Sequence, residues 1–383
     1  MPSGIRNTVI QSLSAVGATQ EAQFYAELFA SQDPERFALI VLDPRCLKNP
    51  LLESLVSNLR ILADLRLTPI LLVGALDKDH TSVKFQSQRL TKALVGVGVK
   101  AAKRNTASYG LIEEVRKLCR TNRLPVLELS GTRAGLDLKA LVAAIEPAKT
   151  IFLQPSGGLT QDGNRIAVLN IDQIDETIAT AKITKGQQLF LNHVKSLSES
   201  ALAADKSSKA VYVIASPLNL LAELFTTKGS GTLLRRPAKF KTVRHLRELN
   251  EAALRLSIDE AFNKPLGDNF MKTALHKGIV EVDYRGGALF TKLAGLTYLS
   301  KFWVSEEARG EGIARDIWEE AISNVPDFFW RSRMGNPFND WYMRACDGMQ
   351  ISGEWRVFWK GLGAPEIPGA IIAAASAPDD FKS

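Results

Sequence analysis

The first part of the chain alternates short apolar runs with longer amphipathic segments. The apolar runs predict buried strands, and the segments between them repeat their hydrophobic positions with the period of a helix. The expected strands cover 37–42, 69–73, 125–129, 150–153 and 210–215, and the expected helices cover 20–30, 50–65, 84–95, 111–120, 136–145, 171–181 and 187–197. Apolar strands that alternate with helices are typical of a parallel sheet covered on both faces. Residues 1–232 are therefore expected to form a three-layer α/β domain with a mostly parallel sheet.

The pattern changes after a segment rich in glycine and basic residues. Gly229-Ser230-Gly231 and Arg235-Arg236-Pro237 indicate a boundary, and we place a linker at 233–242. The later elements are expected as helices at 243–261, 312–323 and 340–344 and as strands at 279–284, 288–291, 298–304, 327–332 and 355–360. Arg285-Gly286-Gly287 is a hairpin signal. Residues 243–365 therefore predict a mixed-sheet α/β domain, and residues 366–383, rich in alanine and proline, are expected to be a flexible tail.

Length and composition narrow the class of protein. A chain of 383 residues is long enough for two or three domains, and 45% hydrophobic with 23% charged residues is typical of a globular protein. No apolar run reaches the roughly 18–20 residues that span a bilayer. The net charge is +7, which can indicate nucleic acid, an anionic surface or small anionic ligands, but the basic residues are scattered, which weakens the nucleic-acid interpretation. We expect no nucleic-acid or membrane partner.

The cysteines and histidines show no metal-site spacing. Cys46, Cys119 and Cys346 do not suggest pairing, and a reducing compartment is expected: the cytoplasm, or the mitochondrial matrix if the source is eukaryotic. The four histidines lack the spacings of zinc sites or of a Ser-His pair, so no metal is expected. Cys346 has two interpretations, a covalent acetyl carrier or a structural thiol, and structural thiols are far commoner.

A glycine-containing loop connects the strand at 298–304 to the next helix. Its residues are Arg309, Gly310, Glu311, Gly312, Ile313 and Ala314, which fit R-x-x-G-x-A. Backbone N–H groups of such a loop, with the positive end of the helix, can bind a diphosphate, although a plain helix start also explains the pattern. The loop resembles that of the GNAT N-acetyltransferases, which implies acetyl-CoA as co-substrate. Phe302, Trp303 and Val304 would then offer backbone groups to the pantetheine arm.

Further motifs narrow the resemblance. They are Tyr298-Leu299-Ser300-Lys301-Phe302, Phe329-Trp330-Arg331-Ser332-Arg333, Asn336-Pro337, Trp341-Tyr342 and Asp347-Gly348. Together they resemble the acetyltransferase domain of N-acetylglutamate synthases of the vertebrate-like and bifunctional synthase/kinase type. Ser300, Phe338 and Asp340 depart from the family pattern, which has Asp, Ile and Pro there. The resemblance implies transfer of acetyl from acetyl-CoA to the α-amine of L-glutamate, in arginine biosynthesis.

Basic side chains suit the carboxylates of such an acceptor. Alternation along a strand places Arg331 and Arg333 on one face, where guanidinium forks can bind carboxylates. A surface pair of arginines in local ion pairs is the other interpretation. Lys301 lies inside an apolar strand and either finds an anionic partner or points outward from an edge. By resemblance, Lys301, the segment 331–336 including Ser332, and Lys264 would hold glutamate.

Tyr342 is the candidate acid. Transfer from a thioester needs a neutral amine, a stabilised oxyanion and a protonated leaving thiolate. A tyrosine hydroxyl can protonate sulfur, and backbone N–H groups near 302–304 can hold the oxyanion. Packing within Asp340-Trp341-Tyr342 is the competing interpretation. Resemblance favours the acid role and places Asn336 near the reacting amine.

The first domain resembles amino-acid kinases of the acetylglutamate kinase type, on motifs between residues 149 and 232. Phosphoryl transfer needs lysines and glycine amides, but this chain has Asp43-Pro44-Arg45, Gly74-Ala75-Leu76 and Gln154-Pro155-Ser156 at the corresponding turns. Kinase activity is therefore expected to be absent, and the domain to serve homo-oligomeric assembly or regulation, with L-arginine as an effector implied by resemblance.

Two alternatives to a glutamate acetyltransferase stay open. The chain could acetylate a different amino acid, because Ser300, Gly335 and Phe338 could reshape the acceptor pocket. It could also be a catalytically inactive, arginine-responsive regulatory subunit, since its first domain has lost kinase residues. The intact loop at 309–314 argues against the second alternative.

Overall fold

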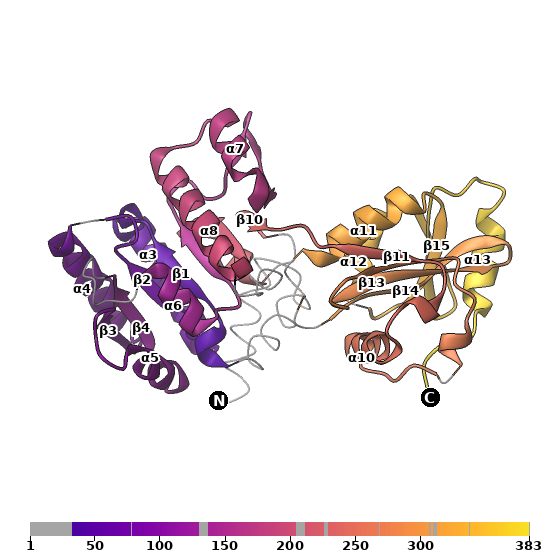
Figure 1. Ribbon diagram of the computed structural model, residues 1–383, viewed down its shortest axis with the longest axis horizontal. Helices are drawn as coiled ribbons and strands as arrows, with labels where there is room; N and C mark the ends of the chain where they lie inside the picture. The colour runs from indigo at the N-terminus through magenta and orange to yellow at the C-terminus, as the bar shows by residue number, and fades with distance from the viewer. Residues whose placement is uncertain are drawn as a thin grey trace. The chain divides into compact units, whose positions relative to one another are not determined.

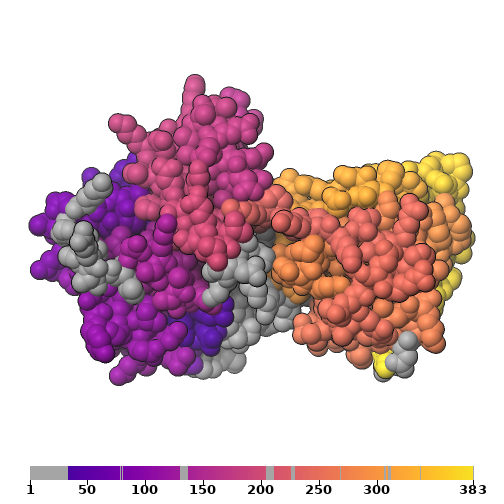
Figure 2. All heavy atoms as spheres, in the orientation of Figure 1, coloured from indigo at the N-terminus to yellow at the C-terminus, as the bar shows by residue number. Residues whose placement is uncertain are grey.

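The chain divides into two compact units, Met1–Arg236 and Pro237–Ser383. The computed structural model describes residues 33–77, 79–129, 137–203, 211–225, 229–267, 269–305, 308, 312–336 and 338–382. The helix expected at 20–30 lies outside these residues. In Figures 1 and 2 the colour runs from indigo and magenta in the first unit to orange and yellow in the second.

The N-terminal unit is built on a sheet of eight strands within the described residues, in the order β3-β4-β2-β1-β5-β9-β10-β8. The strands are β1 (Leu39–Leu42), β2 (Ile70–Val73), β3 (Ala101–Asn105), β4 (Leu124–Glu128), β5 (Thr150–Leu153), β8 (Val168–Asn170), β9 (Tyr212–Ala215) and β10 (Thr232–Arg235). Neighbouring strands run parallel except β9 and β10. A separate short hairpin joins β6 (Thr160–Gln161) to β7 (Asn164–Arg165). The predicted mostly parallel sheet is confirmed.

Helices cover both faces of this sheet. They are α3 (Leu51–Asp64), α4 (His80–Gly96), α5 (Leu111–Arg120), α6 (Leu138–Ile145), α7 (Ile174–Thr180), α8 (Lys185–Ala203) and α9 (Leu220–Phe225). Ile40 and Leu42 of β1 pack with α3, α4 and α9, while Leu39 and Val41 pack with α5, α6 and α8. All four side chains are fully buried, which explains why this strand is apolar throughout.

The strand β3 was not anticipated from the sequence. Its residues, Ala-Ala-Lys-Arg-Asn, lack an apolar run, and none of them is buried. The strand forms an edge of the sheet, where it pairs with β4 alone. Because an edge strand can remain largely unburied, β3 needs no apolar run, and the hydrophobic pattern does not predict it.

The C-terminal unit is built on a mixed sheet of seven strands within the described residues, in the order β11-β12-β13-β14-β15-β17-β16. They are β11 (Phe240–Val243), β12 (Lys277–Glu281), β13 (Gly286–Leu293), β14 (Leu296–Val304), β15 (Phe328–Arg333), β16 (Gly348–Ser352) and β17 (Trp355–Lys360). All neighbours are antiparallel except β14 and β15, which run parallel. The predicted mixed-sheet fold is confirmed.

Four helices of the described residues cover the two faces of this sheet. They are α10 (Glu251–Phe262), α11 (Ile313–Asn324), α12 (Asn339–Ala345) and α13 (Ile367–Ser376). One face carries α11 and α12, which pack on Phe328, Trp330 and Phe358. The other carries α10, beside Trp303, and α13, beside Phe329. Successive side chains of β15 alternate between the two faces, so Phe328 and Trp330 pack with α11 and α12, and Phe329 packs with α13.

Three of the expected segments differ from the structure. The predicted linker at 233–242 is largely strand, because β10 runs to Arg235 and β11 begins at Phe240. The helix expected at 243–261 begins only at Glu251, because β11 runs to Val243 and a short 3-10 helix at Leu246–Glu248 precedes it. The predicted flexible tail contains α13, whose Ala370, Ile371 and Ala374 are buried against the sheet. Small apolar residues at helical spacing form a packing stripe there, which the composition concealed.

Gly287 has a strict packing requirement. A Cβ at this position would lie 2.5 Å from the Trp303 ring and 2.7 Å from the Ile279 carbonyl oxygen. We expect Gly287→Ala to lower the free energy of unfolding by about 1–3 kcal/mol, because overpacking forces neighbours to move. Urea denaturation measures this, and Gly369→Ala in α13, where a Cβ meets nothing within 4 Å, should be neutral or slightly stabilising. Equal effects of the two substitutions would contradict the prediction.

Candidate active site

The two parallel strands of the C-terminal unit separate as they run. The register between β14 and β15 consists of one residue pair, Tyr298 and Phe329, although β14 continues to Val304 and β15 to Arg333. Beyond that pair, the edge of β14 that faces β15 has no paired residues in β15. An open strand edge can bind an extended chain through backbone hydrogen bonds.

An aromatic cluster covers this opening on the α11 side. The ring of Tyr342, in α12, lies 6.4 Å from that of Phe302 on β14, 5.6 Å from that of Trp330 on β15 and 5.5 Å from that of Phe358 on β17. Trp341 stacks on Phe302 at 5.5 Å. The short helix α12 thus places two aromatic side chains over the point where β14 and β15 part.

Polar atoms in this cluster are deeply buried. Tyr342 is 7% exposed, and burial raises the pKa of its phenol above the usual value, so the hydroxyl keeps its proton at neutral pH. Trp330 is 2% exposed, and its Nε1 donor has no hydrogen-bond partner within the described residues. An unsatisfied buried donor beside an open strand is a group that a ligand's acceptor would satisfy.

Ser332 and Asn336 form a polar pair on the same face. The Asn336 amide donates to Ser332 Oγ over 2.8 Å, and its Oδ1 accepts from the backbone N–H of Phe338 over 2.9 Å. Asn336 thereby orders the turn that leads into α12, close to Tyr342 in the chain. The resemblance placed Asn336 near the reacting amine, and that role remains a proposal.

Lys301 lies on the opposite face because β14 contains a bulge. The register with β13 shifts between Leu289 and Phe290, so that Leu289 pairs with Lys301 and Phe290 with Leu299. Leu299 therefore packs with the α11 side, and Lys301, only 5% exposed, lies among residues of the α10 side, with its Nζ 5.4 Å from the centre of the Phe270 ring. Burial lowers the pKa of Lys301, an effect that the nearby Asp380 carboxylate opposes.

Arg331 and Arg333 share that face, as alternation predicted. Both guanidinium groups lie over the Trp355 ring, 3.9 Å and 4.6 Å from its centre. Arg331 donates to the carbonyl oxygens of Ala374, Ala377 and Pro378 at 2.9, 2.6 and 2.9 Å. Arg333 pairs with Glu354 at 2.5 Å and, at 3.4 Å, with Asp379.

The end of the chain connects these cations, and sequence reasoning missed it. Asp380 forms an ion pair with Lys301 and accepts from Ser300 Oγ over 3.2 Å. Lys264 is exposed, and its neighbour Pro265 accepts from the backbone of Lys382 over 2.9 Å. The adjacent carboxylates in Pro378-Asp379-Asp380-Phe381 were a signal that an anionic segment could meet the basic strand.

The predicted residues therefore divide between two faces of one opening. Lys301, Arg331 and Arg333 lie on the α10 side with the loop that contains Lys264, whereas Phe302, Ser332, Asn336 and Tyr342 lie on the α11 side. An acceptor bound to the cations on the α10 side and a thioester bound on the α11 side would meet between β14 and β15.

The expected coenzyme loop is only partly described. Arg309, Gly310 and Glu311 lie outside the described residues. Gly312, at φ +80°, begins α11, whose first residue, Ile313, is buried. Val304 packs in the α11-side core with Ala314 against it, whereas the Trp303 side chain points to α10 and donates to Ser257 Oγ over 2.8 Å. Trp303 can thus contribute backbone groups to a ligand, but its indole belongs to the core.

Other candidate centres are weaker. Cys346 is half-buried and burial raises the pKa of its thiol, which disfavours the reactive thiolate of an acetyl carrier. Among the described residues no group of three or more His, Cys, Asp or Glu side chains is placed to hold a metal ion. Likewise, no helix in the described part of the chain is long and apolar enough to cross a membrane.

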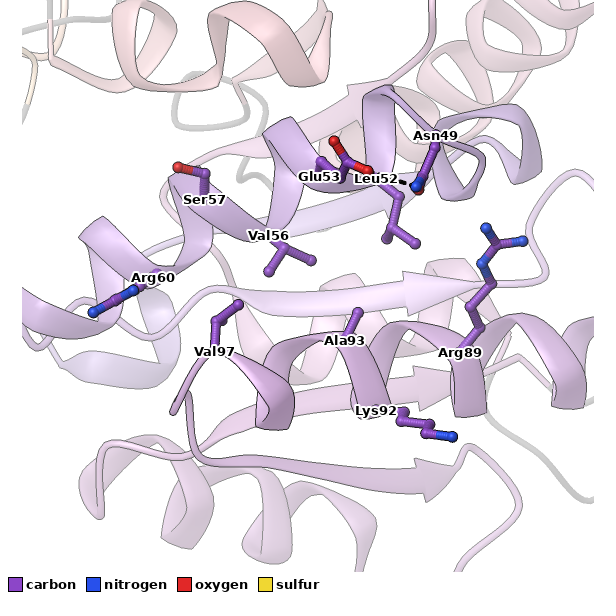
Figure 3. Close-up of a pocket in the computed structure, with 10 residues that line it drawn as sticks. All are labelled: Asn49, Leu52, Glu53, Val56, Ser57, Arg60, Arg89, Lys92, Ala93 and Val97. Atoms are coloured by element: carbon purple, nitrogen blue, oxygen red, sulfur yellow. Dashed lines mark hydrogen bonds between the residues drawn. The ribbon is translucent and has the colours of Figure 1, made fainter.

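A hollow of about 570 Å³ lies in the N-terminal unit (Figure 3). Its floor is apolar, formed by Leu52 and Val56 of α3 and Ala93 of α4, and Arg60, Arg89 and Lys92 lie around it. It contains none of the residues predicted for acyl transfer.

The carboxyl edge of the first sheet holds buried polar groups. Asp43, directly after β1, is 3% exposed and pairs with Arg45 at 2.6 Å. Gln154, after β5, is fully buried, and its Oε1 has no partner within the described residues. The residues directly after β1 are Asp43, Pro44 and Arg45 rather than a lysine and glycines, so this turn differs from the phosphate-binding turn that the resemblance to kinases would require.

The open parallel pair followed by a buried helix start defines the C-terminal unit as an N-acetyltransferase fold. Residues 241–375 match the family model described as "NAT, N-acetyltransferase, of N-acetylglutamate synthase". The match confirms the expectation of an amino-acid N-acetyltransferase for this part of the chain.

Relatives align with most of the chain. The "Acetylglutamate kinase" of Xylella fastidiosa is 29% identical over 91% of this chain and 95% of that protein. The human mitochondrial N-acetylglutamate synthase is 34% identical over 62% of this chain and 46% of that protein, so the chain spans about half its length. These relatives confirm the resemblance to both an acetyltransferase and an acetylglutamate kinase.

A solved structure shares the two-unit fold. N-acetylglutamate synthase from Neisseria gonorrhoeae, complexed with coenzyme A and N-acetyl-glutamate, aligns with a TM-score of 0.51 at 16% identity over 90% of this chain and 99% of that one. Its complex with coenzyme A and L-arginine gives the same TM-score at 14% identity. At these identities the likeness establishes the fold.

Proposed function

We propose that the chain is an acetyl-CoA:L-glutamate N-acetyltransferase of arginine biosynthesis. The observation that carries the proposal is the opening between β14 and β15, with Lys301, Arg331 and Arg333 on one face and Tyr342 on the other. Three clustered cations suit a dicarboxylate, and the buried phenol suits a proton donor. The family of the domain supports the same reaction.

Acetyl-CoA fits the described part of the opening. The backbone groups of β14 that are not paired with β15 can form hydrogen bonds with the pantetheine amides. Trp330 Nε1 is a buried donor that lacks a hydrogen-bond partner within the described residues. The amides around Gly312 and the start of α11 would meet the diphosphate, together with the loop residues Arg309, Gly310 and Glu311. The N. gonorrhoeae protein of the same fold binds coenzyme A, which supports this assignment.

The reaction follows from these positions. The neutral α-amine attacks the thioester carbon, forming a C–N bond and an oxyanion that backbone N–H groups near 302–304 stabilise. Collapse of the intermediate breaks the C–S bond, and Tyr342 gives its proton to the departing sulfur. The amine nitrogen loses its proton to solvent, from which the phenol is reprotonated. Asn336 lies on the Tyr342 side, where it can orient the amine.

The decisive assay is thiol release from acetyl-CoA with purified chain. We expect release that depends on L-glutamate and is saturable in both substrates, with N-acetylglutamate as the product by mass spectrometry. A panel of other amino acids tests the alternative that a different amine is acetylated. Binding of acetyl-CoA by thermal shift tests the inactive regulatory subunit. Folded protein that ignores both substrates would exclude the proposed function.

Phosphorylation of N-acetylglutamate is the second candidate activity, favoured by the name of the Xylella fastidiosa relative. We propose that it is absent, because the turn after β1 carries Asp43 and Arg45 in an ion pair rather than a lysine and glycines. The expected result is no ADP formation from ATP with N-acetylglutamate under conditions that support acetyl transfer. ADP formation at a comparable rate would show that this edge is a working phosphoryl-transfer site.

The N-terminal unit then serves assembly or regulation. The N. gonorrhoeae protein of the same fold was captured with L-arginine, which supports arginine as an effector of this chain as well. We further propose a homo-oligomer, and a cytoplasmic or, in a eukaryote, mitochondrial location. Analytical ultracentrifugation with and without arginine measures assembly, and glutamate-dependent thiol release with added arginine measures regulation.

A further inference from the structure

The segment Ala377–Lys382 lies across the face of β14 and β15 that carries the cations. Its backbone is held as a short added strand, because Gly267 N donates to Asp380 O over 2.8 Å, Lys382 N donates to Pro265 O over 2.9 Å, and Leu266 forms an antiparallel bridge with Phe381. The Phe381 ring packs 5.0 Å from that of Phe262. The segment therefore connects α13 to the loop at 263–267, and its end comes to the surface (Figure 2, yellow).

The segment brings two carboxylates to the cations that the acceptor would need. Asp380 pairs with Lys301 and accepts from Ser300, while Asp379 lies 3.4 Å from an Arg333 nitrogen. Arg331 binds backbone carbonyls at the start of the segment, among them that of Pro378. Two neighbouring carboxylates on one lysine and one arginine resemble, in charge, a bound amino dicarboxylate.

We propose that Ala377–Lys382 is an internal competitor of the acceptor, which must leave the basic face before a dicarboxylate binds there. The proposal rests on the proposed function, in which Lys301, Arg331 and Arg333 hold the acceptor. An acceptor carboxylate and Asp380 cannot both occupy the place beside the Lys301 ammonium. Acceptor binding is thus an exchange of one carboxylate for another.

The contacts make such an exchange feasible. The buried Lys301 ammonium needs an anion, and Asp380 is the carboxylate with which it forms an ion pair in the described structure, so a substrate carboxylate can replace it without leaving the charge unpaired. Pro378 and Asp379 are exposed, and Asp380 and Phe381 are half-buried. A segment with so little buried surface belongs to the regions that open at low free-energy cost.

The tether makes the competition effective. A covalently attached segment acts at an effective concentration of roughly millimolar, independent of protein concentration. If the open form is about 10% populated, the apparent acceptor affinity is about tenfold weaker than the intrinsic one. A free dicarboxylate at high concentration would still displace the segment.

The first experiment compares the chain with its Asp379→Asn, Asp380→Asn double variant, which keeps the backbone contacts. We expect the KM for L-glutamate to fall about tenfold, with kcat and the KM for acetyl-CoA unchanged. Asp327→Asn, an exposed aspartate in the same unit, is the matched control and should change nothing. An unchanged or raised KM for glutamate in the double variant would overturn the proposal.

The second experiment needs no turnover and no substitution. The amides of Gly267 and Lys382 donate the backbone hydrogen bonds that hold the segment to the loop at 263–267. Their hydrogen exchange should accelerate when L-glutamate is added at saturation. Strands of the sheet core such as β12 should keep their protection. Unchanged exchange overturns the proposal even if glutamate is acetylated. Faster exchange at these amides without any thiol release would overturn the proposed function but support the competition between L-glutamate and the segment Ala377–Lys382.

Discussion

Replacing Tyr342 with phenylalanine is expected to lower kcat for acetyl transfer by about 10²- to 10⁴-fold, the range typical of a lost general acid. The ring contacts with Phe302, Trp330 and Phe358 survive the substitution, so the fold and the KM values should change little. Burial raises the pKa of this phenol, so in the natural chain kcat should not fall through loss of the Tyr342 proton at any pH below about 10. Steady-state thiol release measures each of these quantities.

The control for this experiment is a second buried phenol. Tyr212 on β9 is 2% exposed, and burial raises its pKa to about 12. Tyr212→Phe removes a hydroxyl of similar burial from the N-terminal unit and should leave kcat unchanged. If Tyr342→Phe also retains full kcat, Tyr342 is a packing residue, which is the other interpretation of its sequence motif.

Replacing Arg331 with lysine is expected to raise the KM for L-glutamate by roughly 10- to 100-fold while kcat stays within a few-fold. Lysine keeps the charge but loses the planar fork, and charged hydrogen bonds contribute about 1.5–3 kcal/mol each. The same substitution weakens the bonds from Arg331 to Ala374, Ala377 and Pro378, so the melting temperature should fall as well. Arg331→Ala should raise the KM further.

The design must separate acceptor binding from release of the C-terminal segment, since loosening that segment lowers the KM. Arg331→Lys is therefore compared both in the natural chain and in the Asp379→Asn, Asp380→Asn background. Arg255→Lys is the matched control, because Arg255 lies in the same unit and forms its ion pair with Glu251 rather than with the segment Ala377–Lys382. A KM for glutamate that stays constant in both backgrounds would remove Arg331 from the acceptor site.

Much of the fold could be predicted because its strongest elements carry local signals. Helix α5, at Leu111–Arg120, matches its predicted range, since its apolar and charged residues separate cleanly onto two faces. The strand β17, at Trp355–Lys360, was likewise predicted with its boundaries. The edge strand β3 was not predicted, because a strand that buries few side chains needs no apolar pattern.

The sequence proposed residues for the candidate site, but their arrangement in space came only from the structure. The motif around Lys301 and that around Arg331 named the cations, and their alternation placed the two arginines on one face. The position of Lys301 on that same face depends on the bulge in β14, which appears only when its register with β13 is known. The C-terminal helix and the aspartates after it were expected to form a flexible tail rich in alanine and proline, and only their contacts place them against the sheet and the cations.

The sequence by itself predicted most of the α/β elements and the boundary region between two units, and it proposed the residues of an acetyltransferase site, because these depend on local periodicity and on short motifs. Only the tertiary structure decided how those residues divide between two faces and what meets the cations. The physical reason is distance along the chain: the ion pair between Lys301 and Asp380 and the bonds from Arg331 to the end of α13 join segments that lie far apart in sequence. Such contacts depend on how whole strands and helices pack, and no local pattern encodes them.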